Sequence, residues 1–141
     1  HDALPISYPI RLTEENAQEI ISQYDIVVDG CDNFSTRYLI NDICAEMGKV
    51  YVYGAICGFE GQVSVFHYGE EKKSYRDLYP DEEEMRRMPP PPKGVMGITP
   101  AVTGSIEATE VLKIICGFGE VLSGKLWTID LRTLQSNKFS L

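Results

Sequence analysis

Residues 26–37 are Ile-Val-Val-Asp-Gly-Cys-Asp-Asn-Phe-Ser-Thr-Arg, and this order predicts a strand that turns directly into a helix. The apolar residues 26–28 form a short buried run, and Asp32-Asn33 is a strong helix N-cap pair. Such a turn lies at the carboxyl end of a parallel strand, where open α/β sheets bind their ligands. The carboxylates of Asp29 and Asp32 can hold a hard cation such as Mg²⁺ there, although capping is the commoner use of Asp.

Three ordered motifs extend this pattern along the chain. They are DGCDNFSTRYLIND at 29–42, GKVYVYGAICGFEGQVSVF at 48–66, and GVMG at 94–97 ahead of EATEVLK at 107–113. Together they resemble the adenylating enzymes of the ThiF/MoeB/HesA family, the bacterial relatives of ubiquitin-activating enzymes. The likeness runs from about Tyr8 to the last residue. The positions that match the first two family motifs are Asp29, Asp32, Asn33, Thr36, Arg37, Gly58, Gly61, Gln62 and Val63.

The predicted fold class is α/β. Strands at 24–29, 50–55 and 62–68, with a helix at about 33–47 that ends at Gly48, give the order β-α-β-β. This order predicts a parallel part followed by a mixed or antiparallel part. The resemblance implies the C-terminal half of a Rossmann-like ThiF-type fold, a mixed sheet with flanking helices.

Further elements are expected on both sides of this core. Thr13 is predicted to cap a first helix, and Thr99-Pro100 to open a later one with apolar residues at 102, 106, 112 and 115. A closing hairpin is expected at 126–130 and 134–139, and a long irregular stretch at about 69–97, which contains the proline run 89–92.

The first residues are interpreted as an artefact. The chain has no initiator Met, and His-Asp-Ala-Leu-Pro-Ile is what the end of a common sequencing adapter encodes. Residues 1–7 are therefore excluded from fold reasoning, and 8–141 are treated as a partial ThiF-type adenylation domain. The family's phosphate-binding G-x-G-G-x-G turn precedes the matched region, so the chain alone is expected to be inactive.

Composition narrows the class of protein. The net charge of −8 argues against nucleic acid as the main ligand, and no run is long and apolar enough for a membrane helix. The four cysteines, Cys31, Cys44, Cys57 and Cys116, form no C-x-x-C pair. Scattered cysteines of this kind are typical of reduced residues, which predicts a cytoplasmic location.

The resemblance implies a specific chemistry. Family members use ATP and Mg²⁺ to attach AMP to the C-terminal glycine of a ubiquitin-like sulfur-carrier protein, for thiamine, molybdopterin or a related pathway, and are usually homodimers. Asp32 matches the family's catalytic Mg²⁺-binding aspartate, and Asn33 the neighbouring nucleotide-contacting residue. Asp29 could orient the site. Arg37 could form a surface or interhelical salt bridge or contact the nucleotide, with the salt bridge favoured.

Two departures from the family pattern bear on metal and sulfur chemistry. Many members bind structural zinc through two C-x-x-C pairs, but Ser74 and Asp77 occupy the places of the first pair. Zinc is therefore predicted to be absent, since one pair cannot make a Cys₄ site. A loop cysteine that takes part in sulfur transfer in some members corresponds to Pro90 here, which makes covalent sulfur chemistry at that place doubtful.

Two other functions remain open from the sequence. The lost cysteines also fit a non-catalytic subunit that binds the carrier protein without adenylating it. A weaker alternative is a nicotinamide-dependent oxidoreductase with a Rossmann-like core, which would need a catalytic acid or base. His67 is the only histidine outside residues 1–7, and its place at a strand end favours an ordinary structural role.

Overall fold

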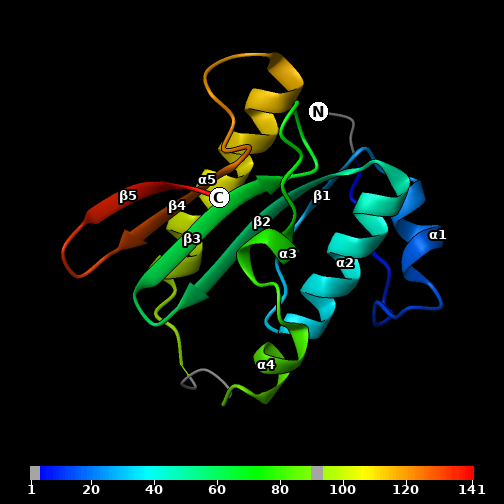
Figure 1. Cartoon of the computed structure of the whole chain (residues 1–141), viewed down its shortest axis with the longest axis horizontal. Helices are drawn as coiled ribbons and strands as arrows, with labels where there is room; N and C mark the ends of the chain where they lie inside the picture. Colours follow the sequence, from blue (N-terminus) through cyan, green and yellow to red (C-terminus); the bar gives the residue numbers. More distant parts are fainter. Residues whose placement is uncertain (1–3, 90–93) are drawn as a thin grey trace.

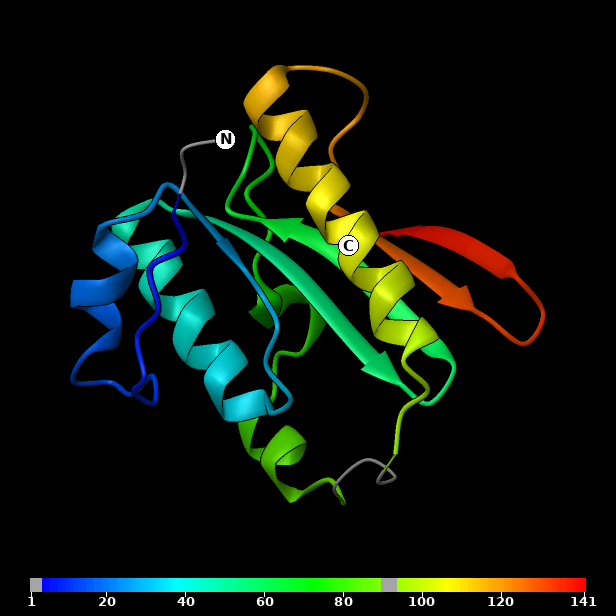
Figure 2. The ribbon, with the colours of Figure 1, turned by 180° about the vertical axis from the view of Figure 1, so that it is seen from behind.

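A single mixed sheet with helices on both faces forms the chain (Figure 1). The computed structural model describes residues 4–89 and 94–141. The prediction about Pro90 therefore lies outside the described residues. The predictions about residues 1–7 and about the proline run 89–92 lie partly outside them. Helices α1 and α2 cover one face of the sheet, and α5 crosses the other (Figure 2). No helix among the described residues has the length and apolar character needed to cross a membrane.

The sheet contains five strands in the order of the sequence. Strand β1 pairs with β2 in parallel, and every later pair is antiparallel. This arrangement confirms the predicted fold class and the closing hairpin. The strands are β1 (Ile26–Val28), β2 (Val50–Cys57), β3 (Glu60–Phe66), β4 (Lys125–Asp130) and β5 (Gln135–Ser140); the helices are α1 (Ala17–Ser22), α2 (Phe34–Met47), α3 (Tyr75–Leu78), α4 (Glu82–Arg87) and α5 (Ile98–Cys116).

Helix α2 follows the sequence prediction closely. The Asn33 side chain accepts a hydrogen bond from the Thr36 amide at 2.8 Å, which satisfies one free donor of the first turn. Gly48 adopts the left-handed conformation, with φ of 64°, and ends the helix. Ile40 and Cys44 are buried on the side that packs on the sheet. The predicted N-cap and C-terminal stop of this helix are confirmed.

Two predicted N-caps are wrong. Helix α1 begins at Ala17, and Thr13 contributes its backbone amide to the Asn16 side chain instead of capping the helix. Helix α5 begins at Ile98, so Thr99 lies inside it; the buried Thr99 hydroxyl donates to the carbonyl of Gly58 at 2.8 Å. At Thr13 the interaction involves the backbone amide, and at Thr99 the hydroxyl bonds to a carbonyl 41 residues away in the sequence.

The predicted apolar face of α5 is also only partly correct. Ile106 packs on the sheet, but Leu112 and Ile115 are 53% and 67% exposed. The buried positions of the helix include polar Thr103, Glu107 and Glu110. Polar side chains fit there because the sheet beneath carries Gly54 and Gly61, which leave room for them.

The stretch 69–97 is more regular than predicted, because it contains α3 and α4. Ser74 and Asp77 form a capping box around the start of α3: the Ser74 hydroxyl accepts from the Arg76 amide at 3.1 Å, and Asp77 Oδ2 accepts from the Ser74 amide at 2.7 Å. Asp81 caps α4 by accepting from the Glu84 amide at 2.9 Å. These short-range bonds order a segment that has no strong apolar periodicity.

Candidate functional site

A cavity of about 1050 Å³ opens at the carboxyl ends of β1 and β2. The loop after β1, the turn between β2 and β3, and the first half of α5 form much of its wall. The Thr99 hydroxyl ties the start of α5 to the β2–β3 turn through Gly58, whose own φ is 59°. All three motifs of the sequence analysis therefore meet at one edge of the sheet.

Asp29 is the buried centre of the loop after β1. Its Oδ1 accepts from the Cys31 amide at 2.8 Å, and its Oδ2 accepts from Arg37 Nε at 3.0 Å and from the Tyr51 hydroxyl at 2.8 Å. The side chain has no exposed surface. Because both oxygens are engaged, Asp29 holds the loop in shape and leaves no free ligand for a cation.

Arg37 extends this loop network toward the sheet. Its Nη2 donates to the Cys31 carbonyl at 2.8 Å, and its guanidinium carbon lies 5.7 Å from the ring centre of Tyr53. The favoured salt bridge is confirmed, but the partner is the strand end at Asp29, not a surface or helical residue. The charge of Arg37 is thus used to hold the loop together.

The thiol of Cys31 belongs to the same network. Its Sγ lies 2.8 Å from Asp29 Oδ1. Burial, followed by the nearby charge of Asp29, raises the pKa of this thiol to about 12. A thiol with so high a pKa stays protonated at neutral pH and is a poor nucleophile, so Cys31 fits a structural role.

Asp32 and Asn33 follow in the same loop, but Asp32, unlike Asp29, is exposed. Asp32 lines the cavity, and within the described part of the chain its side chain accepts one hydrogen bond, from Asn33 Nδ2 at 3.2 Å. Asn33 Oδ1 is occupied by the helix cap. One free carboxylate facing an open cavity fits Mg²⁺, which commonly takes one or two protein carboxylates and completes its shell with water and phosphate.

Glu107 is a site residue that the sequence analysis did not identify. Its carboxyl lines the cavity and lies against the backbone of Gly54. Burial, and then the charge of Asp29, raises its pKa to about 7, while Arg37 opposes the shift. The available signal was a pair of polar residues one helical turn apart, Thr103 and Glu107, on a helix that had been expected to bury apolar ones.

The family model described as "ThiF family" matches residues 6–141. The chain belongs to the ThiF family. It is 46% identical over 136 residues to the probable molybdopterin-synthase adenylyltransferase of Pyropia yezoensis, covering 95% of this chain and 36% of that protein. It is 48% identical over 136 residues to the sulfur carrier protein adenylyltransferase of Thermus thermophilus, covering 88% of this chain and 48% of that protein. The chain thus spans half or less of the length of these relatives.

Solved structures with the same fold include Escherichia coli MccB crystallised with MccA. The TM-score is 0.73 at 16% sequence identity, covering 94% of this chain and 41% of that one. The structure of PaaA is also similar, with a TM-score of 0.65 at 12% identity, covering 91% and 46% of the two chains. At these identities the likeness concerns the fold, and it agrees with the mixed sheet described above.

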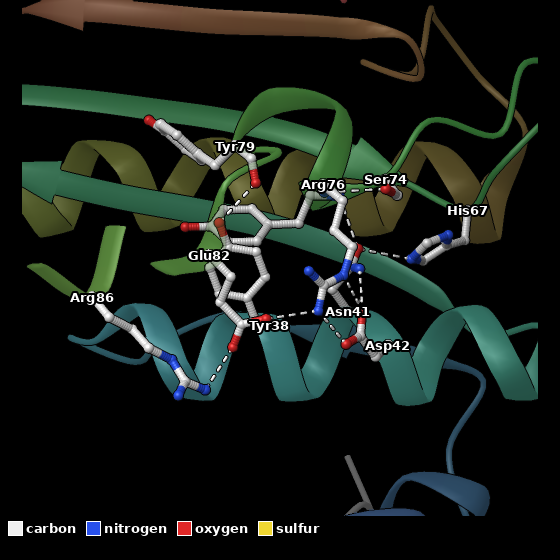
Figure 3. Close-up of polar contacts among 10 residues, drawn as sticks. Tyr38, Asn41, Asp42, His67, Ser74, Arg76, Tyr79, Glu82 and Arg86 are labelled. Atoms are coloured by element: carbon white, nitrogen blue, oxygen red, sulfur yellow. Dashed lines mark hydrogen bonds and ion pairs between the residues drawn. The ribbon is translucent and has the colours of Figure 1, made fainter. Parts of the chain in front are cut away.

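Hydrogen bonds hold one further cavity wall of this ThiF-family chain in place (Figure 3). Arg76 donates to the Asp42 carboxylate at 2.9 and 2.6 Å and to Glu82 at 2.9 Å. The Tyr38 hydroxyl donates to the Tyr79 carbonyl at 2.7 Å. Helix α2 thereby anchors the segment 74–82, whose Tyr79 lines the cavity.

Gln62, which also lines the cavity, donates to the hydroxyls of Tyr53 and Tyr79 at 2.6 and 2.9 Å.

Ser74 and Asp77, which replace the first cysteine pair of zinc-binding ThiF members, form the capping box of this anchored segment. No group of three or more His, Cys, Asp or Glu residues in the described part of the chain is placed to hold a metal. The predicted absence of zinc stays a prediction.

His67 lies far from this edge of the sheet. It follows the last residue of β3, beside the amino end of β2, and its Nε2 is 3.1 Å from Asn41 Oδ1. Burial lowers the pKa of its imidazole. The position and the contact fit a structural role and place this histidine away from the cavity that a nicotinamide enzyme would use.

Proposed function

We propose that the full-length protein carrying this chain uses ATP to adenylate the C-terminal glycine of a ubiquitin-like sulfur-carrier protein. The observation that carries this proposal is the contrast between two carboxylates at one strand tip. The oxygens of Asp29 accept hydrogen bonds from Cys31, Arg37 and Tyr51. The carboxylate of Asp32, in contrast, lines the cavity and is free to bind a ligand. The names of the two relatives, a probable molybdopterin-synthase adenylyltransferase and a sulfur carrier protein adenylyltransferase, support the same reaction.

The chemistry requires little from the protein beyond positioning. An oxygen of the terminal carboxylate attacks the α-phosphorus of ATP, one P–O bond forms, and the bond to pyrophosphate breaks. Mg²⁺, when bound, neutralises phosphate charge. The contribution of Asp32 is to fix the metal-bound phosphates at the strand tip, and that of Asn33 is to hold the first turn of α2 beside the nucleotide.

The test is carrier-dependent exchange of pyrophosphate into ATP by the full-length protein. Asp32→Ala is expected to lower the exchange rate at least about a hundredfold, since it removes the metal ligand. Glu83→Ala is the matched control, because Glu83 is exposed on α4 and forms an ion pair only with Arg87 among residues 4–89 and 94–141. Exchange that persists in Asp32→Ala at the wild-type rate contradicts the proposal.

The chain alone gives a second test. It contains no G-x-G-G-x-G sequence, the phosphate-binding turn that the family resemblance implies. We therefore expect the isolated 141-residue chain to show no exchange while the full-length protein does.

A non-catalytic carrier-binding subunit is the second candidate. Ser74 and Asp77 stand where zinc-binding members have cysteines, and they are bonded to each other and not poised for a metal. Under this alternative the carrier protein binds but is never activated. Mass spectrometric detection of the carrier acyl-adenylate would eliminate it.

The finer assignments follow the resemblance. We propose molybdopterin synthesis ahead of thiamine synthesis as the pathway, because the relative from Pyropia yezoensis is named a probable molybdopterin-synthase adenylyltransferase. We also propose a cytoplasmic homodimer. Exposed apolar residues on α5 support this proposal, because a second copy of the protein would cover them; they are Ile98, Leu112 and Ile115. Light scattering of the full-length protein and of its Leu112→Glu variant tests whether that face joins two copies.

A further inference from the structure

Two buried polar groups on the α5 wall of the cavity have no hydrogen-bond partner among the described residues. They are Thr103 Oγ1 and Glu107 Oε1, in residues that are 2% and 7% exposed. Both residues line the cavity. An unpaired buried polar group is costly, and most buried side-chain polar atoms have a partner. These two groups therefore indicate that a donor is supplied when the cavity is filled.

The sheet beneath α5 is shaped to hold these two groups in place. A side chain at residue 54 would overlap the Glu107 carboxyl, and one at residue 61 would overlap the Thr103 hydroxyl. Gly61 pairs with Ile56, two residues beyond Gly54 on β2. The two glycines therefore lie on the same sheet face, one step apart, and receive two side chains that are one turn apart on α5.

The spacing of the two groups matches an extended peptide. Side chains four residues apart on a helix are separated by about 6 Å at Cβ. In an extended chain, N–H groups on the same side recur every second residue, at about 6.6 Å. Thr103 and Glu107 can accordingly face two main-chain N–H groups of one extended segment.

The acceptor oxygens of this wall select among ligand groups. The carboxyl of Glu107 and the hydroxyl of Thr103 offer acceptors to N–H donors, and the ionised form of Glu107 repels phosphate oxygens and a terminal carboxylate. The phosphates and the reacting carboxylate belong at Asp32, on the loop after β1. The α5 wall suits the uncharged main chain that immediately precedes the reacting carboxylate.

Resting on the proposed function, we propose that Thr103 and Glu107 form a subsite for the carrier protein's C-terminal segment. The two side chains accept hydrogen bonds from main-chain N–H groups upstream of the adenylated carboxylate. Gly104 also lines the cavity, and nothing lies within 4 Å of where its side chain would stand, which leaves open space beside the two residues. The two residues bind and align the tail and take no part in bond making.

Kinetics of the full-length protein test this subsite, with purified sulfur-carrier proteins ending in glycine as probes. Glu107→Ala and Thr103→Val are each expected to raise KM for the carrier about tenfold, with KM for ATP unchanged. Glu107→Gln keeps a carbonyl acceptor and is expected to recover most of the loss. Ser105→Ala is the matched control, because its exposed hydroxyl bonds back to the Ala101 carbonyl at 2.8 Å on the same helix.

A carrier with one backbone amide near its terminus replaced by an ester separates binding from folding effects. The ester lacks the N–H. It is therefore expected to weaken carrier binding to the wild-type protein about tenfold and to change carrier binding to the Glu107→Ala variant little. Equal losses in both proteins, or an unchanged carrier KM in Glu107→Ala, would overturn the subsite.

Direct binding distinguishes this inference from the function on which it rests. Calorimetry without ATP is expected to show the same dependence on Glu107 and on the amide. If exchange is absent but this dependence remains, adenylation is wrong and the subsite stands. If exchange occurs but neither the variants nor the ester alter carrier affinity, adenylation stands and the subsite is wrong. If exchange and carrier binding are both absent, both proposals are wrong.

Discussion

Arg37 Nε donates to Asp29 Oδ2 at 3.0 Å, and the two side chains are almost completely buried. This ion pair joins the end of β1 to the first turns of α2, and so it fixes the loop that carries Asp32. A buried pair of this kind contributes less when intact than is lost when one member is removed, because the other charge is left without a partner.

Asp29→Ala is therefore expected to destabilise the protein by about 3 kcal/mol or more. Chemical denaturation monitored by circular dichroism measures the free energy of unfolding. Arg132→Ala is the control, because its pairs with Glu60 and Asp130 lie at the surface, where ion pairs contribute little to stability. Equal losses in the two variants would contradict the central role of Asp29.

Gly54→Ala is expected to cost about 1–3 kcal/mol, because the added methyl group overlaps the Glu107 carboxyl. Gly30→Ala is the control, since nothing lies within 4 Å of a side chain there. Adding Glu107→Ala should recover most of the loss. Additive losses in the double variant would show that Glu107 does not occupy this space.

The titration of Glu107 is expected to make the free energy of unfolding depend on pH. Its pKa is raised to about 7 in the folded state, from an ordinary 4.5, so the folded protein holds the proton more tightly than the unfolded chain. Stability from this group is fully present below about pH 4.5 and is lost as the pH rises toward 7.

Glu107→Gln removes that titration. The variant is expected to match the wild type at pH 5 and to exceed it at pH 8 by roughly 1–3 kcal/mol. Denaturation midpoints of the two proteins across this range make the measurement. Parallel curves would show that the Glu107 carboxyl titrates normally.

The Asn33 side chain caps α2, and the family resemblance implies that the same residue contacts the nucleotide. Asn33→Ala is expected to lose about 1 kcal/mol of stability and to weaken ATP binding. Asn33→Asp preserves the capping oxygen, so it should retain stability while its added charge weakens ATP binding. An Asp variant that binds ATP as well as the wild type would limit Asn33 to capping.

Arg76→Ala is expected to release the segment 74–82 from α2, because Arg76 bridges Asp42 and Glu82 and lies 4.8 Å from the Tyr38 ring centre. Hydrogen exchange of residues 75–79 should become faster, with a loss of about 1 kcal/mol in global stability. Arg87→Ala, which breaks only an exposed pair with Glu83, should leave that exchange rate unchanged.

The parts of the fold that depend on neighbouring residues could be predicted from the sequence. Asn33 and Gly48 bound α2 through bonds within one turn, and the closing hairpin pairs two strands that are adjacent in the sequence. The strand tip at Asp29 and the meeting of three motifs at one edge follow from the parallel β-α-β unit.

The rest depends on contacts between distant residues. Tyr51 reaches Asp29 across 22 positions, and this bond decides that Asp29 is structural. The polar face of α5 exists because Gly54 and Gly61 make space for it, which no periodicity within the helix itself reveals. Local signals likewise placed caps at Thr13 and Thr99, whose side chains and amides found other partners.

The sheet order, in which every strand neighbours the next one in sequence, also bears on how the chain folds. Hairpins close short loops at small entropic cost, so β2 with β3, and β4 with β5, can form early. Strand β1 is three residues long and reaches β2 only after a crossover that contains α2. Its pairing closes the longer loop, so the strand tip bearing Asp29 and Asp32 is expected to be among the last regions to acquire exchange protection during refolding.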